Sequence, residues 1–135
     1  MALRASEIKV GDTHTERVVE DLKRTQIVMY AGASGDYNPV HTDEIFTTKV
    51  AGYPSVFAHG MLTMGLTGRM LTNFVGDGRL LEFGVRFTSQ VFPGDTLDAT
   101  ATVSGIEGNV VALDISTVNQ SGVVVAKGSA KARAD

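Results

Sequence analysis

The chain of 135 residues contains no cysteine. Disulfide bonds, thiolate nucleophiles and cysteine-based zinc sites are therefore impossible, and this composition fits a reducing compartment. Positive charge is also scarce: 12 lysines and arginines stand against 15 aspartates and glutamates, a formal net charge of −3. The cations are scattered rather than clustered. Because no basic stripe could follow a phosphate backbone, nucleic acid is not an expected partner.

Long hydrophobic runs are absent as well. The N-terminal stretch MALRASEIKV lacks the apolar segment of a signal peptide. The most apolar segment, from Met61 to Val75, contains Arg69 and is shorter than the roughly 20 residues that cross a bilayer. We therefore expect no membrane partner and a cytoplasmic location. With 43% hydrophobic and 20% charged residues, the chain 1–135 is expected to form one domain with its own core.

Helical patterns dominate the first half of the sequence. Apolar spacing and helix start and stop signals predict a helix over 21–33 and a shorter one over 43–50. A third helix is predicted over 60–75, where apolar side chains lie almost all round the helical projection, as is typical of a buried helix. Its glycines Gly65 and Gly68 would let the backbone press against a neighbouring element.

From Arg79 onwards the hydrophobic period becomes two, which indicates strands. Apolar residues alternate with polar ones over 96–103 and again over 111–116. Turn signals lie at 93–95, 107–109 and 120–122. Three or four long antiparallel strands, joined as a meander, are therefore predicted for the second half.

An antiparallel sheet with one apolar face must cover that face. The predicted helix 60–75 is the one predicted helix that is apolar enough to cover this face. We therefore predict an α+β fold in which the sheet wraps around a central helix. This arrangement is the hotdog fold. Because a single small sheet leaves free edges, and pairing them across a two-fold axis is a common remedy, we expect a dimer.

The loop SGDYNPVH, residues 34–41, places a carboxylate and an imidazole five positions apart. Its glycine and proline predict a bent, stiff backbone. Such a bend can aim Asp36 and His41 at one water molecule, with one group accepting its proton and the other delivering a proton elsewhere. The alternative is that both are ordinary turn residues, because Asp beside Gly and Pro is common in turns without chemistry.

A second element favours the chemical interpretation. Residues 57–61 enter the predicted helix 60–75 with no Ser, Thr, Asp or Asn immediately before it. Its first N–H groups are therefore available to a developing negative charge. We assign this role to the amide of Gly60 and interpret His59 as a structural, partly buried histidine bonded to backbone. His14 is expected at the surface.

Other candidate sites are weaker. Asp36, His41 and His59 could be written as a two-histidine-one-carboxylate iron site, but no spacing signature supports one, and we expect no metal. Asn38 is expected to shape the loop. Substrate-binding candidates are Asn38, Tyr37 and Met61. Three cations, Arg69, Arg86 and Lys49, are candidates for binding phosphate groups, and the alternative for each is an ordinary surface charge.

The run from Tyr30 to Asp43 is similar to the hydratase motif of the MaoC-like, (R)-specific enoyl-CoA hydratase (hydratase 2) family, and residues 58–61, AHGM, resemble its second landmark. The likeness covers nearly the whole chain. Within the family the chain most resembles the short single-hotdog dehydratases, such as the beta subunit of the mycobacterial (3R)-hydroxyacyl carrier-protein dehydratase. The resemblance implies a hotdog dimer without cofactor that interconverts trans-2-enoyl and (R)-3-hydroxyacyl thioesters of coenzyme A or acyl carrier protein. It also implies Asp36 and His41 as catalytic residues and Gly60 as the oxyanion donor.

Two alternative functions stay open at the level of the sequence. One is a hotdog acyl thioesterase, which would present the same acyl group to a carboxylate-activated water. The other is a dehydratase subunit that is active only as a heterodimer with a second hotdog chain. The acyl chain length, the carrier, the direction and pathway of the reaction, and the residue that protonates the α-carbon, Asp36 or His41, also stay open.

Overall fold

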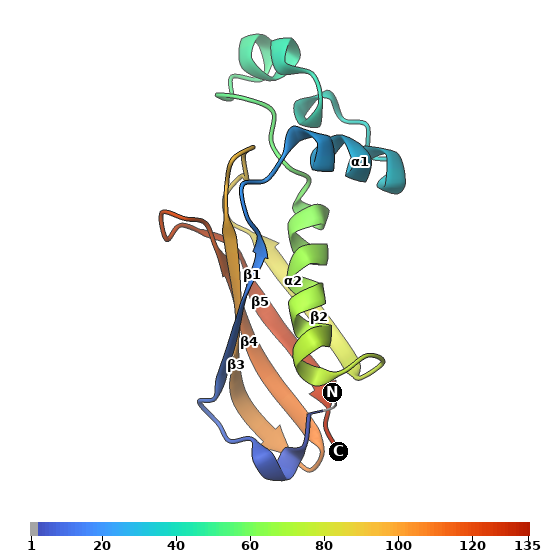
Figure 1. Cartoon of the computed structure of the whole chain (residues 1–135), viewed down its shortest axis with the longest axis vertical. Coiled ribbons are helices and arrows are strands. Elements are labelled where there is room, and N and C mark those ends of the chain that lie inside the picture. The colour runs from blue at the N-terminus through green and yellow to red at the C-terminus, as the bar shows by residue number, and fades with distance from the viewer. Residues whose placement is uncertain (1–2) are drawn as a thin grey trace.

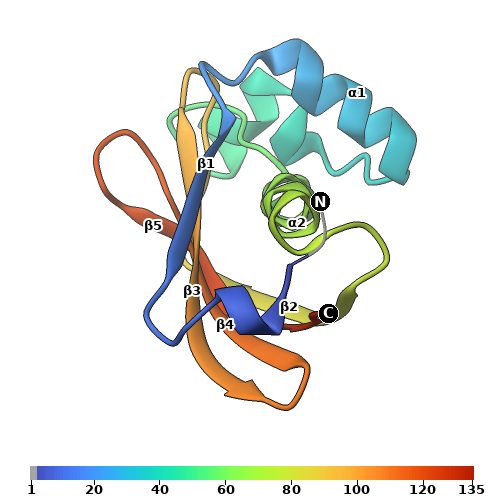
Figure 2. The ribbon, with the colours of Figure 1, turned by 60° about the horizontal axis from the view of Figure 1, so that its bottom comes forward.

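The computed structural model describes residues 3–135, which contain one five-stranded sheet. Its strands are β1 (Thr13–Val19), β2 (Leu80–Phe87), β3 (Leu97–Glu107), β4 (Val110–Val118) and β5 (Val124–Arg133). They lie in the order β1-β3-β4-β5-β2, and every neighbouring pair is antiparallel. The sheet curves around helix α2 (Gly60–Val75), as Figure 2 shows. The predicted hotdog architecture is confirmed.

The helical segments between β1 and α2 gather at the N-terminal end of α2 (Figure 1). They are helix α1 (Arg24–Ser34), the 3-10 turn η2 (Pro39–His41) and the π-helical turn η3 (Phe46–Val50). A further 3-10 turn, η1 (Ala5–Glu7), and the C-terminus lie at the opposite end of the molecule (Figure 1). The loop 34–41 and the start of α2 are therefore brought to the same end of the fold.

The apolar face of the sheet packs against α2. On β3 the residues at alternate positions, Leu97, Ala99, Ala101 and Val103, are buried, and on β4 so are Val111, Leu113 and Ile115. Removing one such large side chain from water stabilises the fold by about 1.5–3 kcal/mol. The period-two pattern of the sequence therefore predicts correctly which residues of β3 and β4 face the core. Their packing against α2 fixes the position of this helix.

Helix α2 has the predicted bounds, but it is not buried on all sides. Met61, Gly65, Arg69 and Asn73 form an exposed stripe with a spacing of four residues. One curved sheet cannot cover the whole circumference of a helix, so one face remains open. Gly68 does allow close packing, because a Cβ there would lie 3.3 Å from the ring of Phe83, whereas Gly65 has no such neighbour within residues 3–135. In that same part of the chain no helix is long and apolar enough to cross a membrane.

Strand β1 is absent from the sequence prediction, which placed helix and loop in the first half. It is an edge strand, and only Val18 of its residues is fully buried. Its pattern is therefore mostly polar. His14, which lies on β1, is only partly exposed, because its ring stacks on Phe74 at 4.7 Å and its Nε2 lies 2.7 Å from Glu16.

The turn at 93–95 does not close a hairpin, so the predicted meander is wrong for β2. Strand β2 pairs with β5, at the far edge from β1. The turn is bonded to another segment instead: the N–H of Gly94 donates to the carbonyl of Leu22, and the N–H of Leu22 donates to the carbonyl of Asp95. These bonds anchor the connection between β2 and β3 near the start of α1.

The two short helical predictions are correct in place and differ in detail. Helix α1 starts at Arg24 rather than at 21, because Asp21 has a left-handed backbone with φ 50°. The predicted helix 43–50 becomes the π-helical turn η3, preceded by Asp43, whose carboxylate accepts a bond from the N–H of Phe46 at 3.0 Å. Both segments still support the loop that lies between them.

The buried hydroxyl pair between α2 and β4 predicts a double-mutant effect. Thr67 and Thr117 are both fully buried, and their Oγ1 atoms lie 2.7 Å apart. Thr67→Val should lower the free energy of unfolding by about 1–3 kcal/mol, because it leaves the hydroxyl of Thr117 unpaired. The double variant Thr67→Val/Thr117→Val should recover most of that loss in urea unfolding. A double variant less stable than both single variants would contradict this account.

Candidate active site

The loop 34–41 is held by three successive bonds from side chains to backbone. Oγ of Ser34 accepts a hydrogen bond from the N–H of Asp36 at 3.2 Å. Oδ1 of Asp36 in turn accepts a bond from the N–H of Asn38 at 3.2 Å. Oδ1 of Asn38 accepts a bond from the N–H of Val40, also at 3.2 Å. Short polar side chains that bond two residues onward replace the bonds of regular secondary structure. The polar residues at alternate positions therefore specify the shape of this loop.

Glycine and proline fix the two ends of the bend, as predicted. Gly35 ends α1 in the left-handed conformation, with φ 77°, and its N–H donates to the carbonyl of Ala31 at 3.0 Å. Pro39 begins η2, and its carbonyl accepts from the N–H of Asp43 at 2.8 Å and from the hydroxyl of Thr47 at 3.2 Å. The loop is therefore anchored on both sides.

The segment leading into α2 runs beside this loop and orients His41. The N–H of Phe57 donates to the carbonyl of Val40 at 3.2 Å, and Nδ1 of His41 donates to the carbonyl of Phe57 at 2.7 Å. The ring of Phe57 also meets the ring of His41 edge to face, with centroids 5.4 Å apart. Sequence patterns did not reveal this role of Phe57, because the contact is made by a backbone carbonyl.

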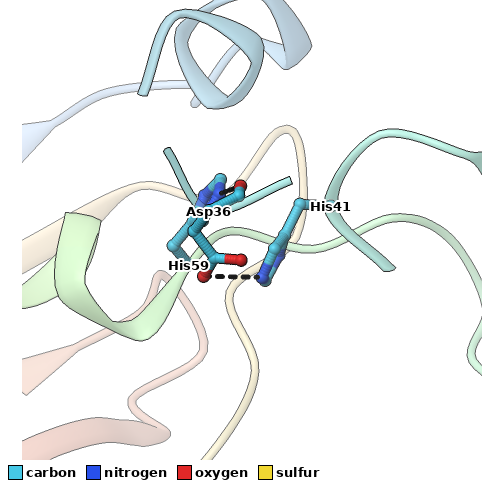
Figure 3. A group of neighbouring side chains, drawn as sticks. All are labelled: Asp36, His41 and His59. Atoms are coloured by element: carbon cyan, nitrogen blue, oxygen red, sulfur yellow. Dashed lines mark hydrogen bonds and ion pairs between the residues drawn. The ribbon is translucent and has the colours of Figure 1, made fainter. Parts of the chain in front are cut away.

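Asp36 and His41 face each other across a short gap (Figure 3). Oδ2 of Asp36 lies 3.8 Å from Nε2 of His41, which is too long for a direct hydrogen bond. Because Nδ1 of His41 donates to a carbonyl, the neutral ring presents an unprotonated Nε2, which is an acceptor like the carboxylate. Two acceptors at this separation can both be satisfied by one molecule that offers two O–H donors.

His41 is suited to act as a base near neutral pH. Burial of the ring lowers the pKa of His41 below its usual 6.5, and the neighbouring His59 lowers it as well. The bond to the Phe57 carbonyl and the carboxylate of Asp36 act in the opposite direction. Because the pKa of His41 is lowered, the neutral imidazole predominates at pH 7.

His59 lies directly behind the pair and is almost fully buried. Its Nε2 donates to the backbone carbonyl of Asp36 at 3.0 Å, and its ring stacks on that of His41 at 3.8 Å (Figure 3). This agrees with the expected histidine bonded to backbone. The three side chains offer ligand atoms within 4.8 Å of one another. However, the two rings are tilted by only 22°, so their lone pairs lie in nearly parallel planes rather than converging on one metal ion.

Gly60 is the first residue of α2, and its N–H has no partner inside the helix. The side chain of the preceding residue, His59, makes no capping bond to the helix start. A Cβ at Gly60 would lie 2.8 Å from the ring of Phe87 on β2, so a larger residue would force this half-exposed ring to move. A cavity of about 140 Å³ borders Gly60, Phe57 and Phe87, and neither Asp36 nor His41 lines it.

The substrate-binding candidates lie in different environments. Asn38 bonds the backbone of its own loop, which matches the loop-shaping role. Tyr37 and Met61 are largely exposed, and Met61 does not line the cavity beside Gly60. Their roles in binding stay predictions.

The three cationic candidates are also separated. Arg69 donates to the carbonyl of Val18 at 2.7 Å, which ties α2 to β1. Arg86 lies on β2 opposite Lys127 of β5, and Lys49 is exposed on η3. The structure does not bring these cations together into one phosphate site.

Comparison with known proteins agrees with this fold. Residues 6–125 match the family model described as a MaoC like domain. The chain is 31% identical over 102 residues to an (R)-specific enoyl-CoA hydratase of Rhodospirillum rubrum, covering 74% of this chain and 69% of that protein. It is 37% identical over 89 residues to 3-hydroxyacyl-thioester dehydratase Y of Mycobacterium tuberculosis, covering 64% of this chain. The chain spans only 31% of the length of that dehydratase.

A solved structure shows the same architecture. The unliganded R-hydratase PhaJ1 from Pseudomonas aeruginosa superposes with a TM-score of 0.85 at 26% identity, covering 98% of this chain and 86% of that one. Since the family model covers most of the sequence, the chain belongs to the MaoC-like domain family.

The environment of His41 predicts its titration. In an NMR titration of the imidazole signals, His41 should titrate below 6.5, because burial disfavours the charged ring. Asp36→Asn should lower this pKa further, because the variant removes the carboxylate that stabilises the imidazolium. A wild-type value at or above 6.5, or an upward shift in the variant, would contradict the described environment.

Proposed function

We propose that this chain, acting as one MaoC-like hotdog domain over 1–135, catalyses the reversible hydration of trans-2-enoyl thioesters to (R)-3-hydroxyacyl thioesters in fatty acid metabolism. The observation that carries the proposal is the pair of facing acceptors, Asp36 Oδ2 and His41 Nε2, 3.8 Å apart. The names of the hydratase and dehydratase relatives support the reaction class. A cytoplasmic location remains part of the proposal.

In the hydration direction the substrate water donates one O–H to each acceptor, which leaves an oxygen lone pair for the β-carbon. His41 Nε2 takes the proton as the carbon–oxygen bond forms, while Asp36 holds the second O–H and orients the attack. The electron pair of the double bond moves towards the thioester, and the proton that His41 took from the water passes to the α-carbon, either directly or through Asp36. Dehydration reverses these steps.

Negative charge develops on the thioester oxygen during this addition. The N–H of Gly60, aided by the positive end of α2, is proposed to meet that oxygen. Loss of one such donor in other enzymes costs about 2.7–4 kcal/mol. The cavity beside Gly60 and Phe57 is proposed for part of the acyl group, with Asn38, Tyr37 and Met61 bordering the substrate. The thioester is carried by coenzyme A or acyl carrier protein.

We further propose that the working form is a homodimer. Strand β2 is an edge of the sheet, and its residues Leu81 and Phe87 are about half exposed. Met61, next to Gly60, is also exposed. Pairing β2 with a second copy would satisfy the free backbone groups of this edge and cover these apolar side chains beside the site. The alternative is a heterodimer, in which a different hotdog chain pairs with the same β2 edge.

The proposed pair predicts the phenotype of two variants. Asp36→Asn and His41→Ala should each slow the hydration of crotonyl-CoA by about 10²–10⁴-fold, because the first removes the carboxylate that orients the water and the second removes the base that takes its proton. Circular dichroism should show an unchanged fold. A folded His41→Ala protein that keeps most of the wild-type rate would rule out the pair as the catalytic centre.

The wild-type assay separates hydration from thioester hydrolysis. We expect the enoyl absorbance of crotonyl-CoA to fall without release of free thiol. Thiol release at the same rate would favour the thioesterase. His14→Ala is a matched control for His41→Ala, because it makes the same change on β1, outside the candidate site.

The oligomeric state has its own test. Light scattering on a sizing column should give a dimer, with activity in the same fractions. Leu81→Glu on the β2 edge should shift the chain towards monomer, whereas Val10→Glu, at an exposed apolar residue outside the sheet, should not. A wild-type monomer that gains activity only when a second hotdog chain is added would contradict the homodimer and favour the heterodimer.

A further inference from the structure

The buried histidine behind the catalytic pair has no part in the proposed proton transfers. His59 is 2% exposed, and its Nδ1 is buried without a hydrogen-bond partner within the described residues 3–135. Because its Nε2 faces a carbonyl, which only accepts, the proton of the neutral ring lies on Nε2. Nδ1 is then a lone pair that meets no donor.

An unsatisfied buried nitrogen is costly to stability, and a position needed only for packing would favour an apolar ring. The contacts of His59 explain why an imidazole is kept. Its Nε2 bonds the carbonyl of Asp36 at 3.0 Å, and its ring lies against His41 with centroids 3.8 Å apart. One side chain therefore touches both members of the pair.

We propose that His59 is a positioning residue for the hydration reaction, holding the backbone of Asp36 through Nε2 and supporting the ring of His41 by stacking. This role rests on the proposed function. It requires a flat ring and a donor at the same time. Phenylalanine would keep a ring without the donor, and glutamine would keep a donor without the ring.

The surroundings of His59 make it a fixed link between three elements. It precedes α2, its ring meets Tyr30 of α1 at 4.8 Å, and it contacts Asp36 and His41 of the loop. Within residues 3–135, the titratable residues with a described contact to the His59 ring are Tyr30, His41 and, through its backbone carbonyl, Asp36. His59 also lowers the pKa of His41, so its removal should let His41 bind a proton at higher pH.

The test compares His59→Phe and His59→Gln with the wild type. We expect His59→Phe to reduce kcat by about 10–100-fold, the usual effect of removing a group that orients a catalytic residue, with little change in KM. His59→Gln should recover part of kcat, because its amide can again donate to Asp36. In both variants the acidic limb of the kcat/KM profile should move to higher pH.

A matched control is available at the other end of the molecule. His14 also stacks on an aromatic ring, that of Phe74, and lies 2.7 Å from Glu16, so His14→Phe makes the same chemical change away from the site. It should leave kcat and the pH profile unchanged. An equal loss in His14→Phe would indicate a general structural effect and would overturn the positioning role.

Two further outcomes are decisive. A folded His59→Phe protein with wild-type kcat and pH profile would overturn the proposal, and if that variant does not fold, the same comparison is made with His59→Gln. An inactive wild type would contradict the proposed function instead. The NMR titration of His41 still tests the position of His59 in that case: an upward pKa shift in the His59 variants supports the contact, and an unchanged pKa overturns it.

Discussion

Two hydrogen-bond acceptors, a carboxylate and an unprotonated imidazole nitrogen, face each other 3.8 Å apart at the N-terminal end of the central helix. Such an arrangement is unfavourable unless a donor joins the two groups, so the surrounding structure must hold it in place. Bonds from side chains to backbone shape the loop of Asp36, and the carbonyl of Phe57 fixes the tautomer of His41. Under the proposed function, one molecule with two O–H donors satisfies both acceptors.

The hydrophobic core provides the rigid support for this geometry. Alternate residues of the sheet pack against one face of α2, and the start of that helix brings His59 and Gly60 to the loop. The candidate site therefore lies where three separate segments meet: the loop after α1, the extended segment that ends at Phe57, and the first turn of α2. Because the segments are bonded to one another, a change in any of them is expected to reach the pair of acceptors.

Sequence patterns predicted correctly those helices and strands in which buried residues recur at a regular spacing. The alternation on β3 and β4 and the apolar run of α2 gave the fold and the bounds of the central helix. The edge strand β1 was missed, because a strand buried on one side only and lined by polar residues carries little hydrophobic signal. The pairing of β2 with β5 depends on backbone bonds between distant segments, which local turn signals do not encode. Residue type, spacing and the family resemblance made Asp36, His41 and Gly60 candidates, and their roles stay predictions. The contacts of Phe57 and His59 with this loop required coordinates.

The most direct measurement is a high-resolution crystal structure of the protein with a bound unreactive enoyl-thioester analogue. The account predicts one water within about 2.7–3.0 Å of both Asp36 Oδ2 and His41 Nε2. It also predicts the thioester oxygen on the N–H of Gly60, with the β-carbon next to that water. Side chains of Asp36 and His41 turned away from each other, or a thioester oxygen bound away from the start of α2, would contradict it.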